Sequence, residues 1–160
     1  MSDQDKDRAE AAKLPEGDVV AVLLTQHATV RDMLDQVKNS TGDQRQQTFT
    51  ALAGLLTAHE TAEKSVIRPV TEDTAGAAVV QARNAEEAHA DEVVAKLKLL
   101  DVTSGDFETK FAEFTQAVSD HAEAEEHEEF PTIIANRSPE ERHALGQQFL
   151  AAFAEAGGTP

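Results

Sequence analysis

The feature that most constrains this chain is an internal repeat with an offset of 62 residues. At this offset the segment HETAEKSVIRP, residues 59–69, aligns with HAEAEEHEEFP, residues 121–131. The same offset separates His27 from His89 and His59 from His121. A repeat of this kind marks two copies of one supersecondary unit. The chain is therefore predicted to fold as two similar halves within one domain.

Apolar residues recur at helical spacing in four long segments and in one shorter segment. The long helices are predicted over 18–38, 43–67, 79–100 and 106–131, and the shorter one over 138–153. Pro69 and Pro131 are expected to end the second and fourth helices, with a loop near 71–76. Because short connections between long helices make antiparallel neighbours, we expect an all-α fold, an up-down-up-down antiparallel four-helix bundle with a short fifth C-terminal helix.

The first residues of the chain show no such period. Residues 1–17 are rich in charge and contain Pro15 and Gly17, so we expect a disordered tail. The bundle is then a single domain over residues 18–155, a length that suits one hydrophobic core.

Charge and residue content exclude several classes of function. The chain has 30 acidic and 14 basic residues and a formal net charge of -16, which disfavours nucleic acid and anionic membrane surfaces as partners. It contains no Cys, Trp or Tyr, which excludes disulfides, thiolate nucleophiles and zinc-thiolate sites. No segment has the pattern of a signal peptide or a membrane span. We expect a cytoplasmic protein that is a monomer or a weak homo-oligomer.

Each long helix has one histidine on its apolar stripe, and two of these histidines are followed by a glutamate at i+4. The residues are His27, His59, Glu63, His89, His121 and Glu125. A buried polar group without a partner costs roughly 1–3 kcal/mol, and a bound cation offsets that cost. A single histidine on such a stripe is typical of a hydrogen-bonded core residue, but the shared offset favours a metal site. Imidazole and carboxylate without sulfur favour iron or manganese over zinc or copper, and two carboxylates able to bridge favour two ions.

The order and spacing of these residues resemble the hemerythrin-like (HHE cation-binding) domain over residues 18–135. The resemblance is carried by His27, His59-Glu60-x-x-Glu63 with Pro69, His89, and His121-x-x-x-Glu125 with Phe130-Pro131. It implies a non-haem centre of two iron ions joined by an oxo or hydroxo bridge. In that centre the four histidines are terminal ligands, and Glu63 and Glu125 are bridging carboxylates.

The chain departs from the oxygen carriers of this family at one position. Those carriers have two histidines one turn apart on the third helix, whereas the residue four before His89 is Ala85. Glu86 is a candidate for the missing ligand and Glu60 is a second, although both also fit a solvated helix face. A carboxylate in place of an imidazole favours Fe(III), which disfavours reversible carriage of dioxygen.

Two functions follow from the resemblance. The first is a di-iron protein that reacts with hydrogen peroxide or dioxygen, with catalase-like turnover in oxidative defence. The second is a binding module without turnover that senses or stores dioxygen, nitric oxide or iron. A metal-free structural bundle is a third interpretation, against which the repeated ligand types argue.

Overall fold

The computed structural model describes residues 1–159, and these residues form helices and no strand. The expectation of an all-α fold is confirmed. In chain order the elements are α1 (Asp3–Ala11), α2 (Val19–Asn39), α3 (Gly42–Ala62), the π-helical turn η1 (Glu63–Ile67), α4 (Arg68–Thr74), α5 (Ala77–Leu97), α6 (Gly105–Glu128), α7 (Phe130–Asn136) and α8 (Pro139–Glu155). None of the helices described here has the length and apolar character needed to cross a membrane.

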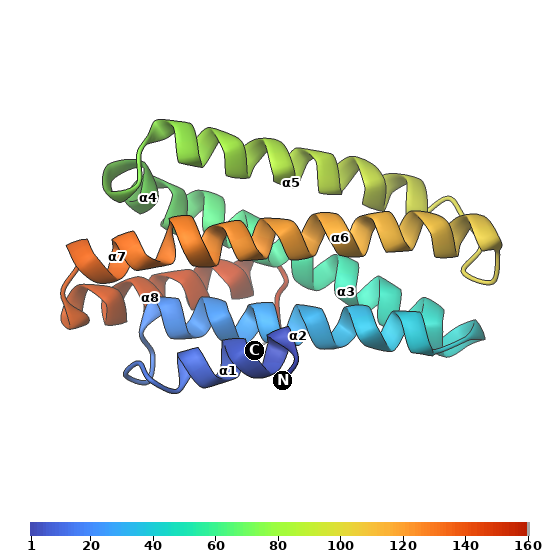
Figure 1. Ribbon diagram of the computed structural model, residues 1–160, viewed down its shortest axis with the longest axis horizontal. Helices are drawn as coiled ribbons and strands as arrows, with labels where there is room; N and C mark the ends of the chain where they lie inside the picture. Colours follow the sequence, from blue (N-terminus) through green and yellow to red (C-terminus); the bar gives the residue numbers. More distant parts are fainter. Residues whose placement is uncertain (160) are drawn as a thin grey trace.

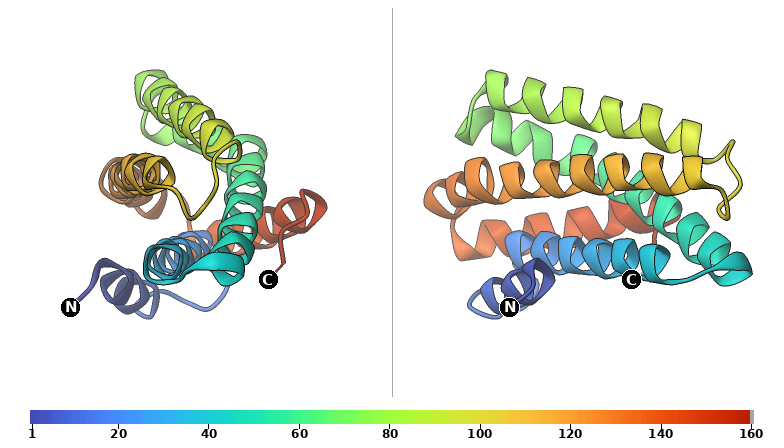
Figure 2. Two further views of the ribbon diagram at one scale, coloured as in Figure 1. Left: turned by 90° about the vertical axis from the view of Figure 1, so that its right-hand side faces the viewer. Right: turned by 45° about the vertical axis from the view of Figure 1, so that its right-hand side comes forward.

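The four longest helices, α2, α3, α5 and α6, have 21 to 24 residues each and form a helical bundle (Figure 1). Helix α2 packs against α3 and α6, and α5 packs against α6. The views in Figure 2 show α8 on the side of the bundle formed by α2 and α3, both of which it contacts. The bundle is therefore covered by a further helix on one side.

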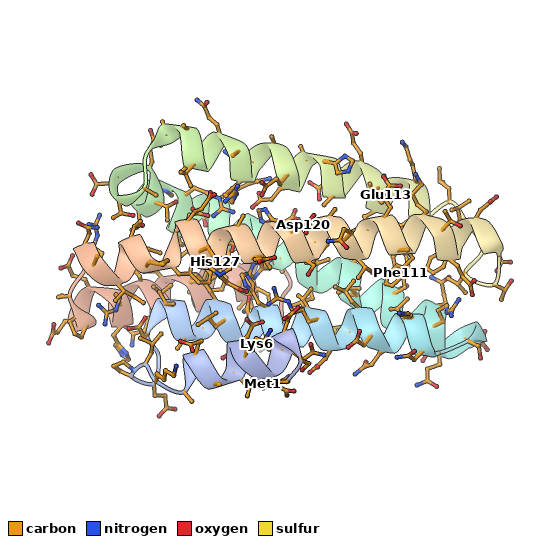
Figure 3. The ribbon with its side chains drawn as sticks, in the orientation of Figure 1. Met1, Lys6, Phe111, Glu113, Asp120 and His127 are labelled. Atoms are coloured by element: carbon orange, nitrogen blue, oxygen red, sulfur yellow. The ribbon has the colours of Figure 1, made fainter. Side chains whose placement is uncertain are left out.

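The core consists of two apolar clusters that lie one after the other along the helices. Helix α6 contributes Phe111 and its apolar neighbours to the first cluster, and Phe130 at the start of α7 belongs to the second. Figure 3 shows Phe111 toward the end of the bundle where α5 and α6 are joined. On α2, Leu24 is in the second cluster and Val30 is in the first. Between these positions lies the buried His27, and together with the buried His59, Glu63 and Glu125 of the neighbouring segments it forms a polar layer at the junction of the two clusters.

Helix α1 corrects the expectation of a disordered tail over residues 1–17. Ser2 and Asp5 form a capping box that starts this helix, which packs along α2. Asp7 is buried and accepts a hydrogen bond from the guanidinium of Arg31 on α2. The helix is held by capping and ion pairs and has no apolar stripe, so a search for apolar periodicity does not detect it.

Both prolines of the repeat begin a short helix, which corrects the expectation of a stop at each and of a loop near 71–76. Pro69 lies in the first turn of α4, and Pro131 lies in the first turn of α7. Proline fits there because the first N–H groups of a helix have no intrahelical partner. Before Pro69, the chain passes through η1, in which the backbone N–H of Arg68 donates to the carbonyl of Glu63.

Candidate metal centre

Three histidines and three glutamates from the four long helices and the π-turn converge in the polar layer. Their ligand atoms form two groups, and within each group all the atoms lie within 4.8 Å of one another. The first group is His27, His59, Glu63 and Glu125, and the second group is Glu63, Glu87 and His121. Glu63 belongs to both groups, so the two positions for a cation adjoin each other.

The Nε2 atoms of the imidazoles face the carboxylates. His59 Nε2 lies 2.9 Å from Glu63 Oε1, and His121 Nε2 lies 3.0 Å from Glu125 Oε1. His27 Nε2 is 3.7 Å from the same oxygen of Glu125. The first two contacts arise because residues four apart share one face of a helix. The two copies of the repeat thus present the same His–Glu pair to the layer.

The second nitrogen of each imidazole is fixed by a neighbouring side chain. The acceptors are Glu126 for His27 at 2.8 Å, Gln26 for His59 at 2.7 Å and Glu86 for His121 at 2.8 Å, each receiving a hydrogen bond from Nδ1. Such a bond sets the orientation of the ring and directs Nε2 away from the acceptor. This arrangement is typical of histidines that bind metal ions.

Several buried nitrogen and oxygen atoms in the layer have no well-aligned hydrogen bond among the described residues, although the ion-pair contacts above bring some of them within 3.0 Å of each other. They are Nε2 of His27 and His121, Oε1 of Glu63 and Glu125, and Oε2 of Glu87. Unpaired buried polar atoms are rare in folded proteins because desolvation is costly. A cation would satisfy several of these atoms together. Imidazole nitrogen and carboxylate oxygen without sulfur are donors that suit iron, so the residues present fit the metal that the sequence predicts.

The electrostatics of the layer favour a positive charge beside the carboxylates. Burial lowers the pKa of His121, but Glu125 and Glu87 outweigh burial and raise this pKa to about 12. Burial raises the pKa of Glu125, yet His121 and Arg68 hold it well below its ordinary value. The carboxylates therefore attract a proton to the imidazole, and a metal ion can replace that proton.

Arg68 is a charged residue of the layer that the sequence did not predict. Its guanidinium is buried and contacts four buried carboxylates, those of Glu63, Glu87, Glu125 and Glu129. Burial lowers the pKa of Arg68, but these carboxylates raise it above its ordinary value. The layer therefore contains a permanent cation of its own.

Helix α5 differs from the expectation at two positions. His89 is exposed and lies outside the convergent donors, and Glu86 is partly exposed and binds His121 Nδ1 instead of facing the cation positions. Glu87, which sequence analysis did not select, is buried and supplies the carboxylate from this helix. At this level the helix is turned by one residue from the predicted phase, since Glu87 is buried and Glu86 is not.

Glu60 lines a small cavity beside the donors. The cavity has a volume of about 30 Å³. It is bounded by the imidazoles and by apolar side chains, namely Val30, Leu56, Ala90, Val118 and Ala122. Burial, and then the neighbouring Asp91 carboxylate, raise the pKa of Glu60 to about 9. Glu60 is absent from both groups of convergent donors and carries a proton at neutral pH.

Comparison with known proteins agrees with this geometry. No curated protein and no solved structure matches the chain. The hemerythrin HHE cation-binding domain matches residues 18–133, a span that contains the whole polar layer. The chain belongs to the hemerythrin HHE cation-binding family.

Proposed function

We propose that this protein is a non-haem iron protein that reacts with hydrogen peroxide or dioxygen. The observation that carries the proposal is the set of buried imidazoles whose Nδ1 atoms are fixed by hydrogen bonds, while unpaired Nε2 and carboxylate oxygen atoms converge on the same layer. Family membership supports a cation at this position. Bound iron would supply the change of oxidation state that reaction with these small oxidants requires.

The first donor group is the better iron site of the two. It offers two imidazoles and two carboxylates, from His27, His59, Glu63 and Glu125. The second group offers one imidazole, and its Glu87 carboxylate makes the shortest contact with Arg68, at 2.5 Å. The family resemblance implies two iron ions, and we assign the first ion to the first group.

The cavity has room for a small reactant. Its volume of about 30 Å³ exceeds the roughly 10–15 Å³ that one water molecule needs on the same measure. Hydrogen peroxide and dioxygen are small enough to lie beside the donors. The apolar side of the cavity excludes other water, which strengthens the electrostatic interactions inside it.

Access leads from a groove between α1 and α6. The groove has a volume of about 750 Å³, and Figure 3 shows Lys6 on α1 and His127 on α6, two of the residues that line it. Arg31 lines both the groove and the inner cavity. It is held there by Asp7 and Glu126, so this ion pair lies between the groove and the cavity, and we propose the groove as the side from which a small oxidant enters.

Glu60 is the residue best suited to supply a proton. Its carboxyl group borders the cavity and is protonated at neutral pH because its pKa is about 9. Cleavage of the O–O bond of peroxide consumes protons, and a positioned acid assists such a step. In this role the Glu60 carboxyl donates its proton to the oxygen that leaves.

The test is anaerobic loading with Fe(II), followed by addition of hydrogen peroxide with a dioxygen electrode in the solution. We expect iron to bind and peroxide to be consumed with release of dioxygen. Glu60→Gln, which cannot donate an acid proton, should retain iron and lose rate. Reversible uptake of dioxygen with no consumption of peroxide would favour the binding module, and a chain that takes up no iron would refute the proposal.

A further inference from the structure

Arg68 is a buried cation inside a layer of donors for a metal ion. Its side chain cannot bind a metal because a guanidinium stays protonated in proteins, donates hydrogen bonds and has no free lone pair to offer a cation. Nη2 donates to Glu63 Oε2 at 3.2 Å and to Glu87 Oε1 at 2.5 Å. Nη1 donates to Glu125 Oε2 at 3.1 Å and to Glu129 at 3.2 Å. Arg68 thus neutralises carboxylates that would otherwise need a metal cation.

In each of Glu63 and Glu125, the guanidinium binds one carboxylate oxygen and leaves the other one facing the imidazoles. In both residues Oε2 accepts a hydrogen bond from Arg68, whereas Oε1 faces the imidazoles and has no hydrogen-bond partner. A carboxylate that bridges two metal ions through its two oxygens needs both of them free. With Arg68 in place, each of these carboxylates has one oxygen left for a metal.

Arg68 binds carboxylates of both donor groups, and its shortest contact is in the second. It lies 3.2 Å from Glu63, which both groups share, 3.1 Å from Glu125 of the first group and 2.5 Å from Glu87 of the second. The first group also has two imidazoles, whereas the second has a single one. A cation there would lie among the same oxygens that already surround a guanidinium, and two positive charges at short distance repel each other.

The repeat shows that the arginine is an addition to one half of the bundle. Arg68 and Phe130 are 62 residues apart and precede Pro69 and Pro131, so they occupy matching positions. Phe130 is buried and stacks on the His27 ring with a centroid distance of 5.5 Å. One half therefore has an aromatic side chain beside the centre where the other half has a cation.

We propose that the Arg68 guanidinium takes the place of a second metal ion, so that the centre binds one iron per chain, in the group formed by His27, His59, Glu63 and Glu125. The inference rests on the proposed function, because it assumes that the metal is iron. It adds that this chain differs in metal stoichiometry from the two-iron centre that the family resemblance implies.

The first experiment uses the full wild-type chain. The protein is loaded anaerobically with Fe(II), excess metal is removed, and iron is counted per chain before oxidation and recording of the electron paramagnetic resonance spectrum. We expect one iron and the signal of an isolated high-spin ferric ion. Two irons with no such signal, as in a coupled ferric pair, would refute the inference and leave the iron proposal intact. A chain with no iron would refute both.

Variants of Arg68 test whether this residue sets the number of iron ions bound per chain. Arg68→Leu removes the cation, and we expect the count to rise from one iron to two. Arg68→Lys keeps the charge and should keep one. Arg45→Leu is the matched control. Arg45 lies near the start of α3 and is also buried, but it binds the backbone carbonyls of Lys38, Ser40 and Val102. A count of one in folded Arg68→Leu would contradict the role of Arg68. If that variant does not fold, the wild-type count still decides the inference.

Discussion

Substitution of Glu126 by alanine should weaken iron binding without removing any metal ligand. Glu126 Oε1 accepts the Nδ1 hydrogen bond of His27 at 2.8 Å and also contacts Arg31 at 2.9 Å. Its side chain is 16% exposed, so water screens these contacts only in part. A hydrogen bond to a charged group contributes about 1.5–3 kcal/mol, and loss of such a partner of a metal-bound histidine typically costs about 10–100-fold in affinity. The two figures agree, because about 1.4 kcal/mol corresponds to a factor of ten.

The assay is competition between the protein and a chelator for Fe(II) under anaerobic conditions. Glu123→Ala is the control, because Glu123 is on the same helix with its side chain 64% exposed. Arg31 keeps its ion pair with Asp7 in the Glu126 variant, so no unpaired buried arginine complicates the result. If Glu126→Ala binds iron as tightly as Glu123→Ala does, the claim that this hydrogen bond orients His27 for a metal is wrong.

Three further predictions concern α5, proton release and Glu60. His89→Ala should keep the wild-type iron content because His89 is exposed and lies outside the donors, whereas Glu125→Ala removes a carboxylate of the first group and should lose iron; elemental analysis decides between them. Burial lowers the pKa of His59, but Glu63 outweighs burial and raises this pKa above its ordinary value, so binding of Fe(II) to the first group should release a proton, and iron affinity should fall as the pH is lowered, as titration in weak buffer will measure. The folded pKa of Glu60 is raised from 4.5 to about 9, so its protonated form stabilises the fold fully below pH 4.5 and this contribution is lost as the pH rises through 9. Glu60→Gln should therefore be more stable than the metal-free wild type by about 1–2 kcal/mol at pH 9 and equal to it near pH 5, as thermal melts will show.

The parts of the centre on α3 and α6 could be predicted because strong apolar stripes lead into them. Phe107, Phe111 and Phe114 are buried at helical spacing on α6, and the same face continues to His121 and Glu125. A stripe of large side chains fixes the inward face of a helix to within one residue. The same His–Glu spacing occurs at the end of α3, so the two copies of the repeat led to the same prediction of inward-facing ligands.

Helix α5 gave no such guide. Six of its seven alanines are exposed and only Ala90 is buried, so alanine content favours the stripe that contains Glu86 and His89 over the buried stripe that contains Glu87 and Ala90. The 62-residue offset between His27 and His89 then favoured the wrong one. Neighbouring positions on a helix are about 100° apart, and this rotation is enough to move His89 into solvent and Glu86 from the metal position to the imidazole behind it.

Arg68 could not be placed from the sequence because a local irregularity of the backbone brings it to the centre. In a regular α-helix, residues five apart point about 140° away from each other, which would separate Arg68 from Glu63. The π-turn over Glu63–Ile67 carries a hydrogen bond from the Arg68 N–H to the Glu63 carbonyl, five residues back. That wider turn returns both side chains to one face, where their guanidinium and carboxylate meet at 3.2 Å. Nothing in the alignment of the two repeats signals this turn, since the matching segment of α6 continues as an α-helix to Glu128. The asymmetry between the halves of the centre therefore arises from the backbone at η1 together with a single arginine, and the ligand residues alone would suggest a symmetric pair of ions.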